Sequence, residues 1–243
     1  MKNNMMVMTA DLKNALSELA FPEKAAFLPK FFKTGKGEYG EGDLFLGVKV
    51  PDQRAVAKEF YAKISLEEIA ELLNSNYHEH RLTALLMLVL QFEKTKDSDM
   101  KAEIIRFYLN NLEGINSWDL VDTSCYKILG RYAFENQTDD LLINLSESEN
   151  MWHKRIAVVG TMHYVKKGNF ELTKKLVLKN LHHSHDLMHK ANGWLLREMG
   201  NKNENELLGF LNLHYKNMPR TSLRYAIEKL DENLRQDYLK GKI

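Results

Sequence analysis

A tryptophan and an aspartate four residues apart are the side chains in this sequence whose spacing best suits chemistry. Trp118 and Asp122 lie in the segment SWDLVD, and an i, i+4 spacing in a helix places both side chains on one face. The alternative for the tryptophan is ordinary core packing. A carboxylate without a function would be costly to bury among the apolar residues of this segment, so one of its acids is expected to have a role.

The other acid of the segment has a simpler explanation. Asn116 or Ser117 could cap a helix that starts here, and Asp119 would then be a favourable charge in its first turn. Asp122 lies one turn further on and escapes this explanation. Its structural alternative is a buried ion pair with Arg155 or the lysine before it.

Three other groups of residues carry weaker signals. His185 and His189 in LHHSHDLMHK have the i, i+4 spacing of zinc ligands, but the glutamate of an HExxH string is missing. A polar turn between helices, or an edge that faces DNA, is favoured there, and no metal site is predicted. Cys125 is interpreted as a small buried thiol. Five glycines mark a loop at about residues 34–47, which lacks the GxxxxGK[ST] string of a nucleotide site.

The elements that must position these residues are predicted to be helices. Only four prolines occur, and nothing between Pro51 and Pro219 forbids helix. Apolar residues recur at helical spacing, as in RLTALLMLVL and RIAVVGTM, and we find no convincing alternation with period two. Pro51 is well placed in the first turn of a helix, and the helical pattern continues from Arg220 to the C-terminus.

Several of these segments open with polar or basic residues and then become apolar, which indicates a repeat. Arg155 and Lys190 are 35 residues apart, and Lys190 and Arg220 are 30 apart. Such loose spacing is typical of degenerate two-helix repeats of the HEAT kind. The predicted fold is therefore an all-α superhelix, or solenoid, that spans residues 1–243 as one domain. An ordinary helical bundle is the alternative.

The overall composition is that of a globular protein without a strong charge. The formal net charge is +1, so contact with a polyanion would require basic side chains gathered on one face. Such a face would form if the second helices of successive repeats make one concave wall; otherwise these residues are ordinary surface charges. The basic residues concerned are Lys154, Arg155, Lys190, Arg197, Arg220 and Arg224.

The cellular compartment is predicted from three features that the sequence lacks: paired cysteines, a signal peptide and a membrane-spanning segment. The single cysteine excludes an intrachain disulfide and fits a reducing compartment. Charged residues interrupt the N-terminal segment, so no signal peptide is predicted, and the apolar runs are too short to span a bilayer. We expect a cytoplasmic protein with no membrane role.

Four strings in order resemble the AlkD-type DNA alkylation repair family of HEAT-like DNA glycosylases. They are FLGVKVPDQR, SWDLVD, MWHKRIAVV and KANGWLLREMG, and the likeness extends from about Phe31 to Arg224. Three features depart from the family pattern. Lys49-Val50 replaces a more polar pair. Ser117 stands where some members have a second tryptophan, and the glycine-rich stretch is longer than in the shortest members.

The resemblance implies a role for each matching residue. Asp122 would be the catalytic aspartate, and Trp118 and Trp194 would flank the deoxyribose of the damaged nucleotide. Arg155 matches an active-site arginine that holds the DNA backbone. Arg54 and Arg197 fall at other basic positions and are further candidates for phosphate contact, with the remaining predicted DNA-binding residues Lys154, Lys190 and Arg220.

The implied activity is hydrolysis of the N-glycosidic bond of N3- and N7-alkylated purines, such as 3-methyladenine and 7-methylguanine, in duplex DNA. We expect no cofactor, because an alkylated purine is cationic and already leaves readily. A monomer is the simplest expectation. The alternatives are a non-catalytic binder of distorted or branched DNA and a helical scaffold that binds another protein.

Overall fold

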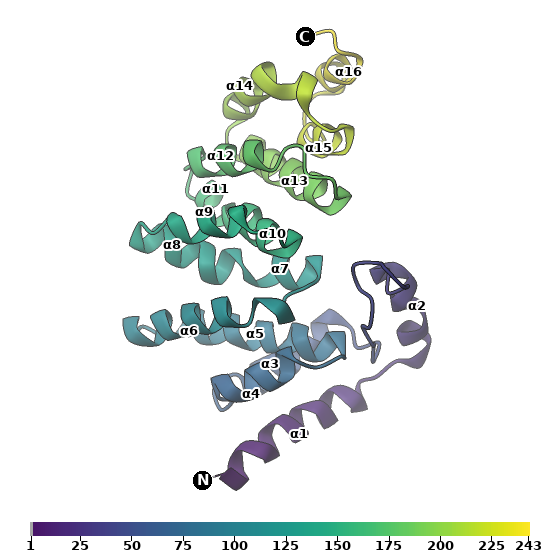
Figure 1. Cartoon of the computed structure of the whole chain (residues 1–243), viewed down its shortest axis with the longest axis vertical. Coiled ribbons are helices and arrows are strands. Elements are labelled where there is room, and N and C mark those ends of the chain that lie inside the picture. Colours follow the sequence, from purple (N-terminus) through teal and green to yellow (C-terminus); the bar gives the residue numbers. More distant parts are fainter. Residues whose placement is uncertain (1) are drawn as a thin grey trace. The chain divides into compact units, whose positions relative to one another are not determined.

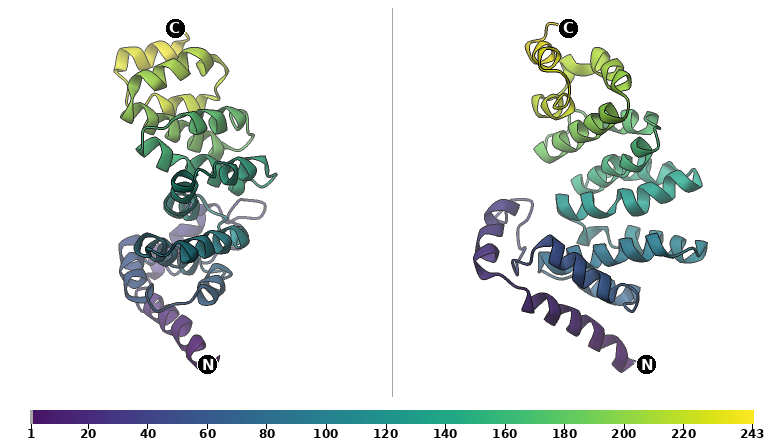
Figure 2. Two further views of the ribbon diagram at one scale, coloured as in Figure 1. Left: turned by 90° about the vertical axis from the view of Figure 1, so that its left-hand side faces the viewer. Right: turned by 180° about the vertical axis from the view of Figure 1, so that it is seen from behind.

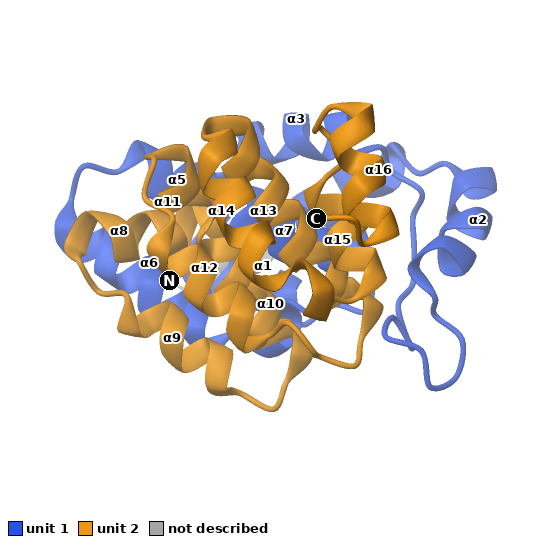
Figure 3. Ribbon diagram, turned by 90° about the horizontal axis from the view of Figure 1, so that it is seen from above, with its two compact units in different colours: residues 1–124 blue, residues 125–243 orange. Residues whose placement is uncertain are grey.

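The computed structural model describes residues 2–243, with the side chains from residue 8 onward. The chain divides into two compact units, Met1–Ser124 and Cys125–Ile243, which Figure 3 colours separately. The first unit contains α1 (Lys2–Glu18), α2 (Pro22–Phe32), α3 (Val50–Phe60), α4 (Leu66–Leu73), α5 (His78–Lys94), α6 (Ser98–Asn110), the 3-10 turn η1 (Leu112–Gly114) and α7 (Trp118–Ser124). The second contains the π-helical turn η2 (Tyr126–Gly130), α8 (Arg131–Asn136), α9 (Asp140–Glu147), α10 (Met151–Gly160), α11 (Met162–Lys166), α12 (Glu171–Lys179), α13 (Asp186–Lys202), α14 (Glu204–His214), the 3-10 turn η3 (Tyr215–Asn217), α15 (Arg220–Ala226) and α16 (Glu232–Lys240).

Helices account for the regular structure of both units, as Figures 1 and 2 show. Over residues 2–243 the one strand-like pairing is an isolated bridge between Leu44 and Tyr77. Helices that follow one another pack together: α3 and α4 against α5 in the first unit, and α9 against α10 and α13 against α14 in the second. The predicted all-α helical-repeat fold class is confirmed. The single domain over residues 1–243 stays a prediction, because compact units can belong to one repeat array.

Helix α5 forms the core of the first unit because its middle, from Leu82 to Val89, is buried on all sides and apolar except for Thr83. Every residue from His78 to Val89 is buried, and the helix packs against α3, α4, α6 and α7. A helix with this composition is stable only when other elements surround it. It therefore fixes the positions of the neighbouring helices, including α7, which carries Trp118 and Asp122.

The first turn of α5 is polar and yet buried, because it binds the glycine-rich segment before α3. The amide of His78 donates to the carbonyl of Leu44 at 2.9 Å. The carboxylate of Glu79 accepts hydrogen bonds from the amides of Leu46 at 3.0 Å and Gly47 at 2.8 Å. No helix lies between Phe32, the end of α2, and Val50, the start of α3, and the end of this segment is held tightly against the core helix.

Gly47 is required where this segment passes α2. Its φ of 82° is in the left-handed region, and a Cβ atom there would lie 2.2 Å from the carbonyl oxygen of Phe21. Any other residue would push the segment away from α2. This close approach, and not only the presence of a loop, explains one of the five glycines of the segment.

In the second unit the backbone at Gly130 packs closely against the backbone at the end of α10. A Cβ atom at this position would lie 2.0 Å from the carbonyl oxygen of Gly160, at the end of α10. We expect Gly130→Ala to lower the free energy of unfolding by roughly 2 kcal/mol, because two packed backbones must separate. Urea denaturation monitored by circular dichroism measures this.

Gly209→Ala is the matched control for this prediction. Gly209 also lies in a helix, but a Cβ atom there would meet no other atom within 4 Å. Alanine favours helix over glycine by up to about 1 kcal/mol, so this variant should be as stable as the natural protein or more so. Equal destabilisation of both variants would show that the contact between Gly130 and Gly160 is not tight.

Candidate active site and DNA-binding surface

Helix α7 carries the first two predicted site residues. Trp118 is its first residue, and Asp122 follows one turn later on the same face, as the spacing predicted. Both side chains are half-buried. The predicted cap is wrong, because the side-chain oxygens of Asn116 and Ser117 are buried without hydrogen-bond partners among the described residues. Residues from other parts of the unit hold the start of this helix in place.

One support for α7 is an aromatic cluster formed by Phe27, Phe31, Phe32, Phe45 and Trp118. The indole of Trp118 stacks on Phe32, with centroids 5.6 Å apart and an interplanar angle of 13°. Phe31 meets the same indole edge-on at 6.0 Å. Phe32 is buried, whereas Phe27 and Phe31 are more than half exposed. The tryptophan is therefore fixed on one side by α2, in contacts of the geometry that aromatic pairs prefer.

A second support is a buried charge network centred on His78 in the first turn of α5. Its Nδ1 lies 2.9 Å from Oδ2 of Asp43, and its Nε2 lies 2.8 Å from Oδ2 of Asp119. Arg81 donates through Nη2 to both oxygens of Asp43, at 2.6 and 2.7 Å, and through Nη1 to the carbonyl of Ser75. Asp119 lies in the first turn of α7 as predicted, but it also connects that helix to α5.

The network changes the pKa values of its members. Burial lowers the pKa of the His78 imidazole, but the charge of Asp119 and the hydrogen bonds to Asp119 and Asp43 outweigh burial and raise it to about 9. For Asp43, burial raises the pKa, yet hydrogen bonds from His78 and Arg81 lower it overall. His78 is therefore a buried imidazolium at neutral pH.

This network could not be predicted from the sequence, although one signal for it was visible. The string HEHR places four polar residues directly before the apolar run LTALLMLVL, and polar side chains in such a position need buried partners. Their partners could not be identified, because Asp43 is 35 residues away along the chain and Asp119 is 41 away. Helical periodicity reports only which face of one helix is buried.

In the second unit, Trp194 and Arg155 lie on the neighbouring helices α13 and α10. Trp194 is half-buried, and its Nε1 donates to Oε1 of Glu198 at 3.2 Å. Arg155 is 4 % exposed, and its Nη1 donates to the carbonyl of Leu187 in the first turn of α13. Arg155 thus fastens the start of α13 to α10.

Three predicted DNA-binding residues share one edge of this unit, which we call the basic edge: Lys154, Lys190 and Arg220. They lie in the N-terminal half of α10, near the start of α13 and at the first residue of α15, and α13 packs against both other helices. Ser222 connects the starts of α15 and α13 by donating to the carbonyl of His189 at 3.0 Å. The basic edge therefore joins three helix N-termini, where the helix dipoles add positive potential.

The other two predicted DNA-binding residues lie apart from the basic edge. Arg197 is two turns beyond Lys190 on α13 and forms ion pairs with Glu228 and Glu198. Arg54 is exposed on α3 in the first unit. Carboxylates that already bind Arg197 would compete with a phosphate for its guanidinium, as Asp186 would for Lys190 on the basic edge, which it binds at 2.8 Å.

The weaker candidate sites have structural explanations. Nδ1 of His185 accepts a hydrogen bond from the amide of Leu187 and caps α13, and His189 bonds to the carbonyl of His183. No group of three potential metal ligands occurs among the side chains of residues 8–243. In the glycine-rich loop, the amides of Gly35 and Gly37 donate to carboxylates of the loop itself. Cys125 is buried.

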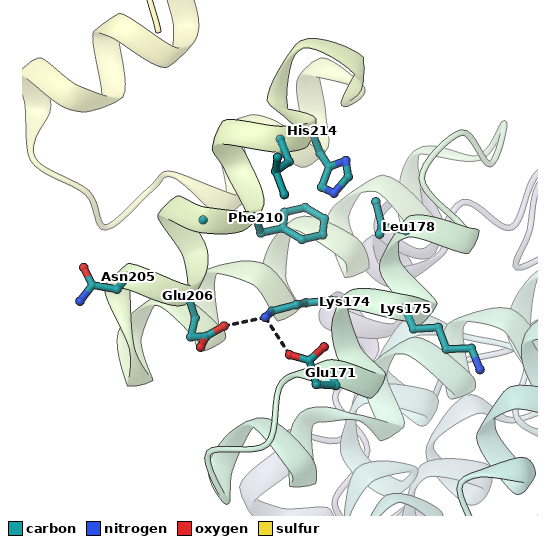
Figure 4. A pocket seen from close by; sticks show the side chains of 10 residues that line it. Glu171, Lys174, Lys175, Leu178, Asn205, Glu206, Phe210 and His214 are labelled. Atoms are coloured by element: carbon teal, nitrogen blue, oxygen red, sulfur yellow. Dashed lines mark hydrogen bonds and ion pairs between the residues drawn. The ribbon is translucent and has the colours of Figure 1, made fainter.

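A groove on the second unit lies between α12 and α14 and has a volume of about 660 Å³ (Figure 4). Lys174 in this groove bonds to Glu206 at 2.6 Å and to Glu171 at 2.9 Å, so two carboxylates already neutralise its charge. None of the predicted site residues lines the groove. It is therefore separate from the predicted chemistry.

None of the helices in the described part of the chain has the length and apolar character needed to cross a lipid bilayer.

The fold defines this chain as an all-α helical-repeat protein. Its candidate site combines a tryptophan and an aspartate on one short helix with basic side chains near the starts of neighbouring helices. The chain belongs to the DNA alkylation repair enzyme family, whose model matches residues 12–230. Among solved structures, it resembles a chain described as a predicted DNA alkylation repair enzyme from Enterococcus faecalis, with a TM-score of 0.67. The two are 18% identical, and the match covers 88% of this chain and 97% of that chain. No curated protein matches.

Family membership confirms the resemblance inferred from the four strings, and it supports an enzyme that acts in the repair of alkylated DNA. The solved structure is too distant in sequence to add more than the fold.

Proposed function

We propose that this protein is a DNA glycosylase that hydrolyses the N-glycosidic bond of N3- and N7-alkylated purines in duplex DNA. The observation that carries the proposal is the placement of Trp118 and Asp122 one turn apart on α7, in a chain of the DNA alkylation repair enzyme family. A carboxylate and an indole on one face suit a reaction in which positive charge develops on a sugar.

The proposed chemistry follows from the charge of the substrate. Alkylation at N3 or N7 makes the purine cationic, so the base leaves as a neutral molecule when it takes the electron pair of the glycosidic bond. C1′ of the deoxyribose then develops oxocarbenium character, which a fixed carboxylate stabilises. Asp122 is the proposed carboxylate. It also positions the water whose oxygen bonds to C1′ and whose proton passes to the carboxylate or to solvent.

The remaining residues are proposed to hold the DNA. Trp118 and Trp194 flank the deoxyribose, and Arg155 binds the backbone near the lesion while it fastens the start of α13. The basic edge binds further phosphates, with Arg54 and Arg197 as additional contacts on the proposed concave DNA-binding face. We further propose a cytoplasmic monomer that needs no cofactor, because the cationic base requires no other activation.

The test is incubation of the protein with duplex DNA that contains methylated purines, followed by counting of abasic sites. A monofunctional glycosylase leaves an abasic site in an intact strand, which breaks only on later treatment with alkali. Strand cleavage without alkali would indicate a lyase instead. Binding without abasic sites would select the alternative, a non-catalytic DNA-binding protein.

A prediction for the basic edge is that Lys190→Ala weakens DNA binding mainly at low salt. If the lysine contacts one phosphate, the slope of log K against log[salt] should become shallower by about 0.9. Fluorescence anisotropy at several salt concentrations measures this slope. Lys175→Ala, an exposed lysine on α12, is the control and should leave it unchanged. Identical slopes for both variants would show that Lys190 does not contact a DNA phosphate.

A further inference from the structure

His78 lies between two carboxylates that come from different parts of the first unit. Asp43 belongs to the glycine-rich segment, and Asp119 to the first turn of α7. The imidazole is 3 % exposed, and each nitrogen is within 2.9 Å of a carboxylate oxygen. Only the imidazolium can donate to both carboxylates, because the neutral ring would direct a lone pair at one of them.

The surroundings of His78 make this bridge rigid. Three charged groups act on the ring: Asp43 from the glycine-rich segment, Asp119 from α7, and Arg81 from its own helix. The two bonds from Arg81 fix Asp43, so the bridge is anchored at that end. At the other end, Oδ1 of Asp119 is buried without a hydrogen-bond partner in the described residues. The bond through His78 is therefore the one that ties this carboxylate to the core.

A second contact connects His78 to α7 through aromatic rings. Phe32 lies against the imidazole with centroids 4.5 Å apart, and it stacks on the indole of Trp118 at 5.6 Å. Phe45 stacks on the imidazole at 5.3 Å and on Phe32 at 5.2 Å. The histidine thus contacts the start of α7 both through Asp119 and through the ring beneath Trp118.

We propose that His78 is a positioning residue for base release: its imidazolium bridges Asp43 and Asp119 and so holds α7 with Trp118 and Asp122 in the orientation that the reaction needs. The proposal rests on the proposed glycosylase function for its kinetic consequence. Its structural part, which concerns the orientation of Trp118, does not depend on that function.

The proposal makes different predictions for two substitutions of Asp119. An asparagine can donate its amide to a neutral imidazole or offer its oxygen to an imidazolium, so Asp119→Asn keeps the bridge in either protonation state. Asp119→Ala removes the bridge at every pH. If Asp119 contributed to stability alone, both variants would be less stable, but the pH dependence of their base release would match that of the natural protein.

The experiment is single-turnover release of methylated purines from duplex DNA between pH 6.5 and 9.5, with DNA affinity measured in parallel. We expect release by the natural protein to fall toward high pH, by up to about tenfold per pH unit once His78 loses its proton. Asp119→Asn should lose this alkaline decline. Asp119→Ala should be slower at every pH with its DNA affinity retained. His80→Gln, the control in the same helical turn, should keep the decline.

An alkaline decline in Asp119→Asn that matches the natural protein would overturn the proposal, as would unimpaired release by Asp119→Ala. If the natural protein releases no base, the proposed glycosylase function is wrong. The positioning role of His78 is then tested by NMR instead. The indole NH signal of Trp118, assigned with Trp118→Phe, should move with pH in the natural protein and stay constant in Asp119→Asn. A signal that ignores pH in both would overturn the positioning role independently.

Discussion

Asp122→Asn is expected to slow release of alkylated purines by about two to three orders of magnitude, while DNA affinity changes little. The substitution keeps the shape of the side chain and removes the charge that the proposal places beside the forming oxocarbenium ion. Removal of one preorganised electrostatic contact has effects of about this size in other enzymes. Single-turnover release measures the chemical step, and fluorescence anisotropy with methylated duplex measures binding.

The matched control is Asp140→Asn, which changes an exposed aspartate in the first turn of α9. It removes the same charge at a place without a proposed function, so release should continue at the natural rate. Circular dichroism of both variants verifies that they are folded. Equal release by Asp122→Asn and the natural protein would remove Asp122 from the mechanism.

The second prediction is a loss of stability between about pH 6.5 and pH 9 that depends on His78. The pKa of this histidine is raised from 6.5 to about 9 in the folded protein, so its protonation stabilises the fold fully below pH 6.5. This contribution is lost as pH rises through the folded-state pKa. A difference of this size corresponds to a contribution on the order of 3 kcal/mol.

Urea denaturation of the natural protein and of His78→Gln at half-unit pH steps tests this prediction. The difference in unfolding free energy should be largest near pH 6.5 and shrink toward pH 9.5. Burial and nearby Lys13 and Arg81 lower the pKa of His80 to about 4, so its effect falls in a separate window below pH 6.5. A difference that is constant across the range would contradict a charged His78 in the folded protein.

The fold class could be predicted from the sequence because its evidence is local. Helical periodicity, the scarcity of proline and the spacing of basic pairs are properties of short segments, and the structure places α10, α13 and α15 where the pairs at Arg155, Lys190 and Arg220 indicated. The same spacing identified the basic edge, since it reflects a repeat in which equivalent helices pack side by side.

The supports of α7 could not be predicted because they depend on contacts that are distant along the chain. The i, i+4 rule identified Trp118 and Asp122 on one face, but it says nothing about what holds the helix. Ser117 was expected as a cap from its type alone, but its buried hydroxyl has no hydrogen-bond partner in the part of the chain that the structure describes. The role falls instead to His78 and Phe32, which reach the helix from α5 and α2.

The most direct test of the account is identification of the free base released when the natural protein is incubated with methylated duplex DNA. Mass spectrometry of the small molecules should show 3-methyladenine and 7-methylguanine well above the amount from the same DNA without protein, and no release of unmodified adenine or guanine. Methylated DNA that is bound but yields no free base above that background would contradict the glycosylase function.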